Sequence, residues 1–375
     1  MDPRVTDLSN DINNLTFTIS NINVSLANAL RRIILNDIPN VVFRTTPHEK
    51  NDATFYKNTS RFNNEIIKQR ISCIPIHITD VEFPIKDYIV EVNKKNVSDT
   101  IEYVTTKDFV IRNVKTDVVL SEAETRKIFP PDPITKEFID IVRLRPKLSK
   151  DIDGEHLHFT CTFSIGTVKE NGSYNVVSTC SYGAARDNIK INEVWTEKAK
   201  ELKGMGKTTG EIEELKRDWL LLDGKRITLP DAYNFTIESV GVFEPMSILE
   251  KACQIMINKL NKFGDDIQSK DGMIASSNTT IPNSFDIKLE GEDYTLGKSI
   301  EYLLFASYYE TQTEANKVLT YCGFIKPHPH IDVSIIRVAF KNSIETSDLI
   351  GYLEAVTTKG LEIFNSIKSN FTRVV

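Results

Sequence analysis

The chain has 375 residues, of which 26% are charged and 40% hydrophobic, with a net charge of −6 and a sequence pI of about 5.7. These values are ordinary for a soluble globular protein with room for two or three domains. The acidic balance argues against a protein whose main task is to bind nucleic acid or an anionic membrane. The absence of an apolar run near the ~18 residues that a membrane span needs, together with a polar N-terminal stretch and five scattered cysteines, predicts an intracellular protein in a reducing compartment.

The first predicted element is a strand followed by a helix in "LTFTISNINVSLANALRRIIL", residues 15–35. Alternating Leu15, Phe17 and Ile19 predict a half-buried strand, and the apolar residues of 26–34 recur at helical spacing. Because that helix buries its apolar face, Arg31 and Arg32 are expected to point away from the core.

Residues 46–158 interrupt this unit with strands of their own, including "ISCIPIHI" and "YIVEVNK", and a proline-rich loop. They are expected to form an inserted, mainly β domain. His156 and His158 alternate with apolar residues, which places both on the polar face of a strand, and no cysteine or carboxylate stands at ligand spacing. We therefore predict no metal site and no cofactor.

The stretch "GMGKTTG", residues 204–210, invites comparison with a phosphate-binding loop. The first glycine of that motif would stand at Glu201, where a carboxylate would repel phosphate, and the preceding residues have helical rather than strand spacing. Thr208 and Glu211 form a capping-box pattern that opens a second helix. The interpretation is a helical hairpin over 192–226, and an NTP-binding enzyme is the alternative.

A strand and a long helix follow in "YNFTIESVGVFEPMSILEKACQIMINKLNKF", which ends at Phe263. Residues 264–284 are polar and lack periodicity, so they are predicted to be a linker. After it, "FDIKLEGEDYTLGKSIEYLLF", residues 285–305, aligns without a gap to residues 15–35 at an offset of 270. The second copy also ends with a strand and a long helix, so the chain contains an internal repeat.

The predicted fold class is α+β, with two related α/β units packed helix to helix as an intramolecular pseudo-dimer. The domain limits are 1–45 with 159–263, the insertion 46–158, the linker 264–284 and the second unit 285–375. Apolar residues recur every three or four positions along both long helices, which indicates a seam between two helices; packing of each helix on its own sheet is the alternative. The seam residues are Leu249, Met256, Leu260, Leu349, Leu353, Val356, Ile363 and Ile367.

The motifs resemble the assembly platform of multisubunit RNA polymerases. "NVSLANALRRIILNDIPNVVF" is similar to the N-terminal motif of bacterial alpha, archaeal D and the third subunit of polymerase II, and "RFNNEIIKQRISCIPI" to a second motif of the D-like group. "IGTVKENGSYNVVSTCSY" resembles a family segment that precedes the last strands. "EDYTLGKSIEYLL" and "VLTYCGFIKPHPHIDVSIIRV" resemble archaeal L and the eleventh subunit of polymerase II.

The resemblance implies a non-catalytic subunit that nucleates polymerase assembly for transcription, without direct sequence-specific nucleic-acid contact. Its implied partners are the second-largest subunit, the largest subunit, which holds the catalytic metal, and small zinc-binding subunits. The implied interface residues, by their positions in the first two motifs, are Asn28, Arg31, Arg32, Glu65 and Arg70.

Two departures from the family pattern stand out. The two halves are usually separate chains, and their fusion resembles polymerases of large cytoplasmic DNA viruses. This resemblance implies that the protein is located in the virion and the host-cell cytoplasm, whereas a cellular subunit would be located in the nucleus. The cysteine cluster of many D-like subunits is absent, since Cys73 is the only cysteine of 46–158. A stand-alone dimeric adaptor that lost its polymerase is a second alternative, which co-purification of polymerase subunits would exclude.

Overall fold

The structure is a computed structural model that describes residues 2–80, 83–147, 149, 153–310, 313 and 316–372. It divides into two compact units. Unit 1 comprises Met1–Ile34, Thr179–Glu238 and Pro245–Val375, and unit 2 comprises Leu35–Ser178 and Ser239–Glu244. The mixture of helices and antiparallel strands confirms the predicted α+β class.

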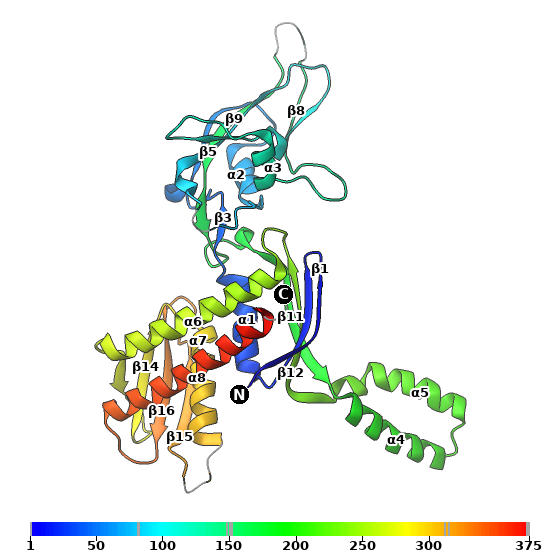
Figure 1. Ribbon diagram of the computed structural model, residues 1–375, viewed down its shortest axis with the longest axis vertical. Helices are drawn as coiled ribbons and strands as arrows, with labels where there is room; N and C mark the ends of the chain where they lie inside the picture. Colours follow the sequence, from blue (N-terminus) through cyan, green and yellow to red (C-terminus); the bar gives the residue numbers. More distant parts are fainter. Residues whose placement is uncertain are drawn as a thin grey trace. The chain divides into compact units, whose positions relative to one another are not determined.

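Unit 1 holds the first repeat, a four-stranded antiparallel sheet with strand order β1-β2-β12-β11 (Figure 1). The predicted alternation is confirmed in β2, where Leu15, Phe17 and Ile19 are buried. The helix α1 follows β2, and the elements span Arg4–Asp11 (β1), Asn14–Ser20 (β2), Val24–Asn36 (α1), Val177–Arg186 (β11) and Thr228–Ser239 (β12).

The second repeat, also in unit 1, has the same topology, with strand order β13-β14-β16-β15 and a helix, α7, after β14. Gly297 in α7 permits a close approach to its own sheet, because a Cβ there would stand 2.0 Å from the Phe324 ring. The elements span Ile274–Ser276 (β13), Ser284–Glu290 (β14), Tyr294–Phe305 (α7), Leu319–Ile325 (β15) and Val333–Phe340 (β16).

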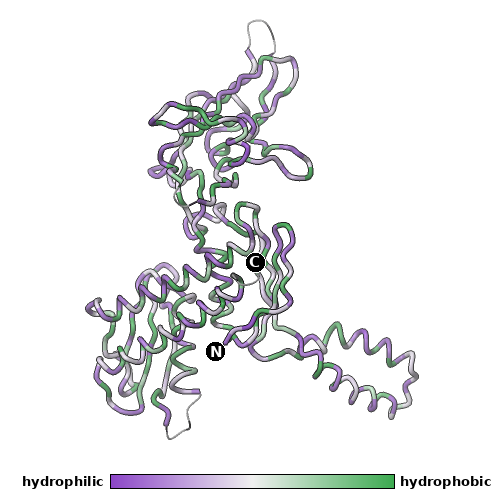
Figure 2. The backbone as a smooth tube through the Cα atoms, viewed as in Figure 1, coloured by the Kyte–Doolittle hydropathy of each residue, from purple (hydrophilic) through white to green (hydrophobic). Residues whose placement is uncertain are grey.

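Each repeat ends in a long helix, α6 (Pro245–Ser269) after β12 and α8 (Thr346–Thr372) after β16. Both helices have a continuous buried face, and hydrophobic segments recur along them between hydrophilic ones (Figure 2). The far end of α8 reaches the first repeat: Phe371 lies edge-on against Phe17, with ring centroids 4.9 Å apart, and Asn370 donates to the Pro3 carbonyl. A helix of one repeat thus covers part of the sheet of the other.

The segment 264–284, which the sequence predicts to be a linker, contains regular structure in its first half. Helix α6 continues to Ser269 because Ile267 is buried, and β13 pairs with β14 beside the buried Met273. The polar composition hides this because a single buried residue per turn is enough to hold a helix end. Residues 277–283, between β13 and β14, are outside the helices and strands.

The predicted helical hairpin is confirmed as α4 (Asn188–Gly204) and α5 (Thr209–Leu221), which lie side by side (Figure 1). Its small core contains Trp195 and Trp219, whose ring centroids are 5.4 Å apart. Gly206 adopts a φ of +83° in the turn, a backbone conformation that favours glycine. The hairpin is therefore a substructure with its own hydrophobic cluster.

Unit 2 is mainly β and has its own core, in which Phe43 stacks against Phe129 and Phe163. Its largest sheet has strand order β4-β9-β5-β7, and two smaller sheets pair β10 with β3 and β6 with β8. Its helices α2 and α3 span Asn64–Ser72 and Glu122–Ile128. The strands are Asn40–Val42 (β3), Ala53–Asn58 (β4), Tyr88–Lys95 (β5), Glu102–Thr105 (β6), Val110–Asn113 (β7), Asp140–Leu144 (β8), His156–Thr162 (β9) and Ser164–Gly166 (β10).

Candidate functional site

The helices α6 and α8 pack against each other in antiparallel orientation. Gln268 donates to Glu354 near one end of the contact, and Lys368 donates to Gln254 near the other. Partner numbers in α8 therefore rise as numbers in α6 fall, which is the arrangement expected for two helices related by an approximate twofold axis.

A glycine of each helix lies at the contact between α6 and α8. A Cβ on Gly360 would lie 3.2 Å from Leu260 of α6 and 3.3 Å from Leu303 of α7. A Cβ on Gly264 would lie 3.6 Å from the methyl group of Thr357. The absence of a side chain at these positions lets the neighbouring leucines fill the space between the helices.

The structure places every residue of the expected seam inside the core. None of the eight side chains has more than 2% of its surface exposed; they are Leu249, Met256, Leu260, Leu349, Leu353, Val356, Ile363 and Ile367. Helices α6 and α8, which carry these residues, contact each other along their length.

Two ion pairs join the first repeat to the turn that precedes α7 in the second repeat. Arg32 of α1 donates from Nη2 to Asp293 Oδ2 at 2.6 Å and from Nε to Thr295 Oγ1 at 3.0 Å. The other carboxylate oxygen of Asp293 accepts the Thr295 backbone N–H at 2.8 Å and so caps α7. Lys259 of α6 donates to both carboxylate oxygens of Glu292 at 2.9 Å.

The side chains of both ion pairs are largely buried. The side chains of Lys259 and Glu292 are 16% and 14% exposed, and those of Arg32 and Asp293 are 26% and 28% exposed. Removal of one partner from such a pair leaves a poorly hydrated charge, which costs more than the pair itself contributes. The arrangement therefore favours one specific alignment of the two repeats.

Arg32 lies off the buried face of α1, as the sequence predicts, but the sequence analysis directed its guanidinium towards another subunit. Its guanidinium is bonded within the chain instead. Arg31 is half-buried and donates from Nε to Asn28 Oδ1 at 3.0 Å, one turn back on α1. At the equivalent positions of α7, Lys298 pairs with Glu301 at 2.6 Å. Both repeats therefore present a polar pair at the same place on the helix that follows the first core strand.

Glu65 and Arg70 lie on α2 in unit 2 and are exposed. Glu65 accepts from Lys68 at 3.2 Å, and Arg70 donates to the Asp140 carbonyl at 2.8 Å while lying over the Phe62 ring. The structure does not pair Glu65 with Arg70, and each makes its contacts within unit 2.

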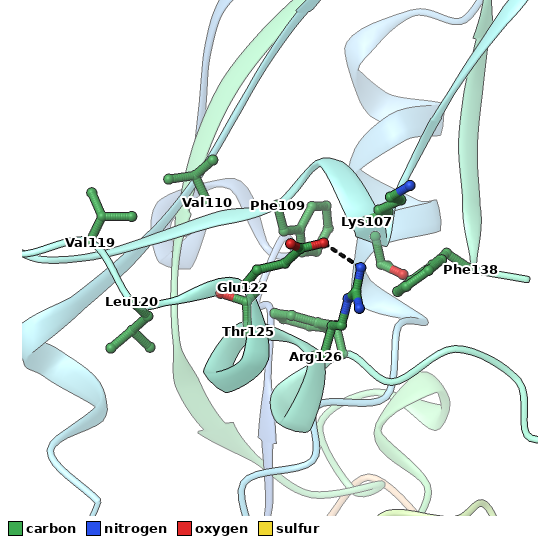
Figure 3. A pocket seen from close by; sticks show the side chains of 11 residues that line it. Lys107, Phe109, Val110, Val119, Leu120, Glu122, Thr125, Arg126 and Phe138 are labelled. Carbon is green, nitrogen blue, oxygen red and sulfur yellow. Dashed lines mark hydrogen bonds and ion pairs between the residues drawn. The ribbon is translucent and has the colours of Figure 1, made fainter. Parts of the chain in front are cut away.

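A small cavity of about 240 Å³ lies in unit 2 between α3 and the loop before β7 (Figure 3). Phe109, Leu120, Phe129 and Phe138 contribute to its lining, and Glu122 and Arg126 at its mouth pair with each other. Cavities that hold small ligands usually have about 300–1,000 Å³. The cavity is below that range, and its charged groups are already paired.

His156 and His158 lie on β9 beside β5, where His156 contacts Asn93 and His158 contacts Glu91. Within the described part of the chain, no group of three or more His, Cys, Asp or Glu side chains is arranged to hold a metal ion. The helices of that same part include none with the length and apolar character of a membrane span.

The "GMGKTTG" loop joins two helices and follows no strand. Thr208 and Glu211 form the predicted capping box, and Lys207 pairs with Glu211 at 3.3 Å. The Glu211 carboxylate accepts from the backbone N–H of Thr208 and from Lys207, while the Glu211 N–H in the first turn of α5 donates to the Thr208 hydroxyl.

We therefore expect no saturable ATP binding by the chain, and no change on Lys207→Ala, when heats of titration are measured by calorimetry. Lys203→Ala, one turn earlier, is the matched control. A saturable isotherm that Lys207→Ala abolishes and Lys203→Ala preserves would contradict this prediction.

Sequence reasoning missed Lys259, Glu292 and Asp293. Lys259 appears in the sequence as one polar residue on the exposed side of an amphipathic helix, and the pair Glu292-Asp293 as a turn. One signal was available: the repeat alignment sets these two acidic residues opposite Ile22 and Asn23, which are neutral. A charge present in only one copy of a repeat is a candidate for an asymmetric contact.

The sheet topology and the helix pairing define a repeat protein with a helical seam, and comparison with known proteins identifies its class. The family model described as the RNA polymerase Rpb3/Rpb11 dimerisation domain matches residues 16–260. The chain belongs to this family. The match runs from β2 into α6, so it includes most of the first repeat together with unit 2, and it ends before the second repeat begins at β13.

Individual relatives agree with the family match. The chain is 25% identical over 279 residues to "DNA-directed RNA polymerase subunit Rpo3" of Pyrococcus horikoshii, which covers 69% of this chain and 95% of the relative. It is 25% identical over 308 residues to "DNA-directed RNA polymerases I and III subunit RPAC1" of Homo sapiens, covering 71% and 85%. The Pyrococcus furiosus Rpo3 protein is 24% identical over 275 residues, covering 68% and 93%.

Proposed function

We propose that the chain is a non-catalytic assembly-platform subunit of a DNA-directed RNA polymerase, with both halves of the platform in one polypeptide. The observation that carries the proposal is the second sheet, which repeats the strand order of the family-matched first sheet and shares the α6–α8 seam with it. The relatives supply the polymerase context, since their names describe them as polymerase subunits. Residues 285–375 then stand for the L-like half that is a separate chain in other polymerases.

The proposed division of labour follows the domains. The two repeats, 1–45 with 159–263 and 285–375, pair with each other; the insertion 46–158 extends the first, and residues 270–273, between α6 and β13, connect them. The eight buried residues of the seam support the pairing role, because an apolar, fully buried contact is typical of obligate interfaces. We propose no catalytic residue and no cofactor for the chain itself.

The proposed docking groups are Asn28 and Arg31 on α1 for the second-largest polymerase subunit, with Glu65 and Arg70 on α2 as a separate contact. Arg31 is half-buried and holds a guanidinium at the surface of a rigid helix, which suits bidentate recognition of a carboxylate. Arg32 is left out because its guanidinium is bonded to Asp293 and Thr295. The largest subunit and small zinc-binding subunits complete the proposed set of partners.

The proposed location is the compartment where the polymerase works. The fusion of the two halves points to a large cytoplasmic DNA virus, and hence to the virion and the host-cell cytoplasm; a cellular polymerase would place the chain in the nucleus.

Affinity purification of the tagged chain from cells that produce it tests the function. Mass spectrometry is expected to find two very large polymerase subunits in amounts equimolar with the chain. Recovery of the chain without them would overturn the platform role and favour a stand-alone adaptor.

Arg31→Glu is expected to lower recovery of those large subunits at least tenfold, because the reversed charge meets acidic groups at the interface. Arg217→Glu, the same change at an exposed position of α5, is the matched control. The free energy of unfolding of both variants is expected to lie within about 0.5 kcal/mol of that of the unmodified chain. Normal recovery with Arg31→Glu would remove Arg31 from the interface and leave the platform role intact.

A further inference from the structure

We propose that the ion pairs Arg32–Asp293 and Lys259–Glu292 form a pairing code, by which the seam of each repeat accepts the other repeat and rejects a second copy of itself. The inference deepens the proposed function, because it rests on the two repeats being the paired halves of the platform.

The strand registers define which residues of the two repeats are equivalent. Phe17 in β2 lies opposite Phe235 in β12, and Ile287 in β14 lies opposite Ile336 in β16. Since residue 287 corresponds to 17 in the repeat alignment, 336 corresponds to 235, an offset of 101. The following helices keep it: α6 begins at Pro245 and α8 at Thr346.

The equivalents of the first ion pair are neutral. Arg32 corresponds to Tyr302 of α7, and Asp293 corresponds to Asn23, whose side chain accepts the Ser25 N–H as Asp293 accepts that of Thr295. The helix cap is thus present in both repeats. The carboxylate is present only in the second repeat, as Asp293, and the guanidinium only in the first, as Arg32. The ion pair exists at one end of the pseudo-twofold arrangement only.

Tyr302 is partly buried in the second repeat. Burial, followed by the negative charge of Asp231, raises the pKa of the Tyr302 phenol to about 12. Asp231 belongs to the first repeat, and its carbonyl accepts the N–H of Ile22, next to Asn23. The negative charge of Asp231 in the first repeat thus reaches Tyr302, the residue of the second repeat that corresponds to Arg32.

The second ion pair is equally one-sided. At the offset of 101, Lys259 corresponds to Gly360, the glycine against which Leu260 and Leu303 pack. Glu292 corresponds to Ile22, which is completely buried. The first repeat thus contributes only cations to the two contacts, and the second repeat contributes only carboxylates.

Self-pairing of either repeat would break both contacts. Two copies of the first repeat would bring Lys259 against Ile22 and Arg32 against Asn23, so that each copy loses the contacts with the Glu292 and Asp293 carboxylates. Two copies of the second repeat would leave Glu292 opposite a glycine and Asp293 opposite a phenol. Shielded charges without partners penalise the wrong pairing, while the apolar seam residues attract either partner.

The test exchanges the charges of the Lys259–Glu292 pair. This pair is chosen over Arg32–Asp293 because Asp293 also caps α7, so that its replacement would disturb the helix as well. The full chain is made with Lys259→Glu, with Glu292→Lys and with both changes, and thermal unfolding and mass in solution are measured. The melting temperature of each single variant is expected to be several degrees below that of the unmodified chain. The double variant is expected to regain at least half of the lost melting temperature and to be a monomer in solution. Lys262→Glu and Glu362→Lys, exposed on α6 and α8, are the controls for net charge.

Specificity is measured with two full chains that carry different tags and are co-expressed. The Lys259→Glu chain and the Glu292→Lys chain are complementary only to each other, so the two tags are expected to co-purify at least tenfold above the level of two unmodified chains. No rescue in the double variant, or no excess of co-purification, would overturn the pairing code. Neither result depends on polymerase subunits, so failure of the code and failure of the platform role are distinguishable.

Discussion

Leu353→Asp is expected to lower the free energy of unfolding of unit 1 by about 5 kcal/mol. The leucine is completely buried in the seam, and its replacement removes about 2–3 kcal/mol of apolar burial, leaves a cavity and buries a carboxylate without a partner. Chemical denaturation followed by circular dichroism measures the change. A protein at the low end of the ordinary range of about 5–15 kcal/mol would be largely unfolded by this loss, and one at the high end would stay folded with a lower denaturation midpoint.

Leu221→Asp is the control for this variant, because Leu221 on the hairpin is 60% exposed and the chemical change is identical. It is expected to change stability by less than about 1 kcal/mol. A Leu353→Asp chain as stable as the Leu221→Asp chain would show that α8 does not form the seam in solution.

Gly360→Leu is expected to destabilise unit 1 by about 3 kcal/mol. The Cβ alone would already stand 3.2–3.3 Å from Leu260 and Leu303, so a larger side chain would push α8 away from α6 and α7. Overpacking of a dense core typically costs about 1–3 kcal/mol, and a leucine in place of a missing side chain lies at the upper end of this range. The melting temperature and the denaturation midpoint report the loss.

Gly351→Leu is the matched control on the same helix. A Cβ on Gly351 has no atom within 4 Å, and the residue is exposed. Leucine has the higher helix propensity, so this variant is expected to be more stable by about 0.5–1 kcal/mol. The same substitution nine residues apart should therefore have opposite signs, and equal effects would contradict the close approach of α8 to α6 and α7.

The local elements were readable from the sequence because their signals are local. The alternation of Leu15, Phe17 and Ile19 predicts β2, and Thr208 with Glu211 predicts the start of α5. The hairpin interpretation of "GMGKTTG" follows from residues within two helical turns on either side. The internal repeat could also be seen in the sequence, because two sheets of the same topology bury apolar residues at corresponding positions.

The linker shows where local signals fail. Residues 264–276 are polar enough to read as unstructured, yet α6 extends through six of them and β13 adds a strand to the second sheet. Composition records how many residues are polar, whereas a helix end or an edge strand needs only one or two buried residues, such as Ile267 and Met273.

The sequence by itself determined the fold class, the repeat and the apolar faces of the two long helices, because hydrophobic periodicity records which side of an element leaves water. Only the tertiary structure decided what each polar residue contacts. Arg32 and Asp293 are 261 residues apart and meet because two sheets of the same topology pack through antiparallel helices. Periodicity correctly placed Arg32 off the apolar stripe of α1, but a position outside the stripe can face water, another subunit or the other repeat. That choice depends on packing between elements far apart in the chain, where no local pattern reports it.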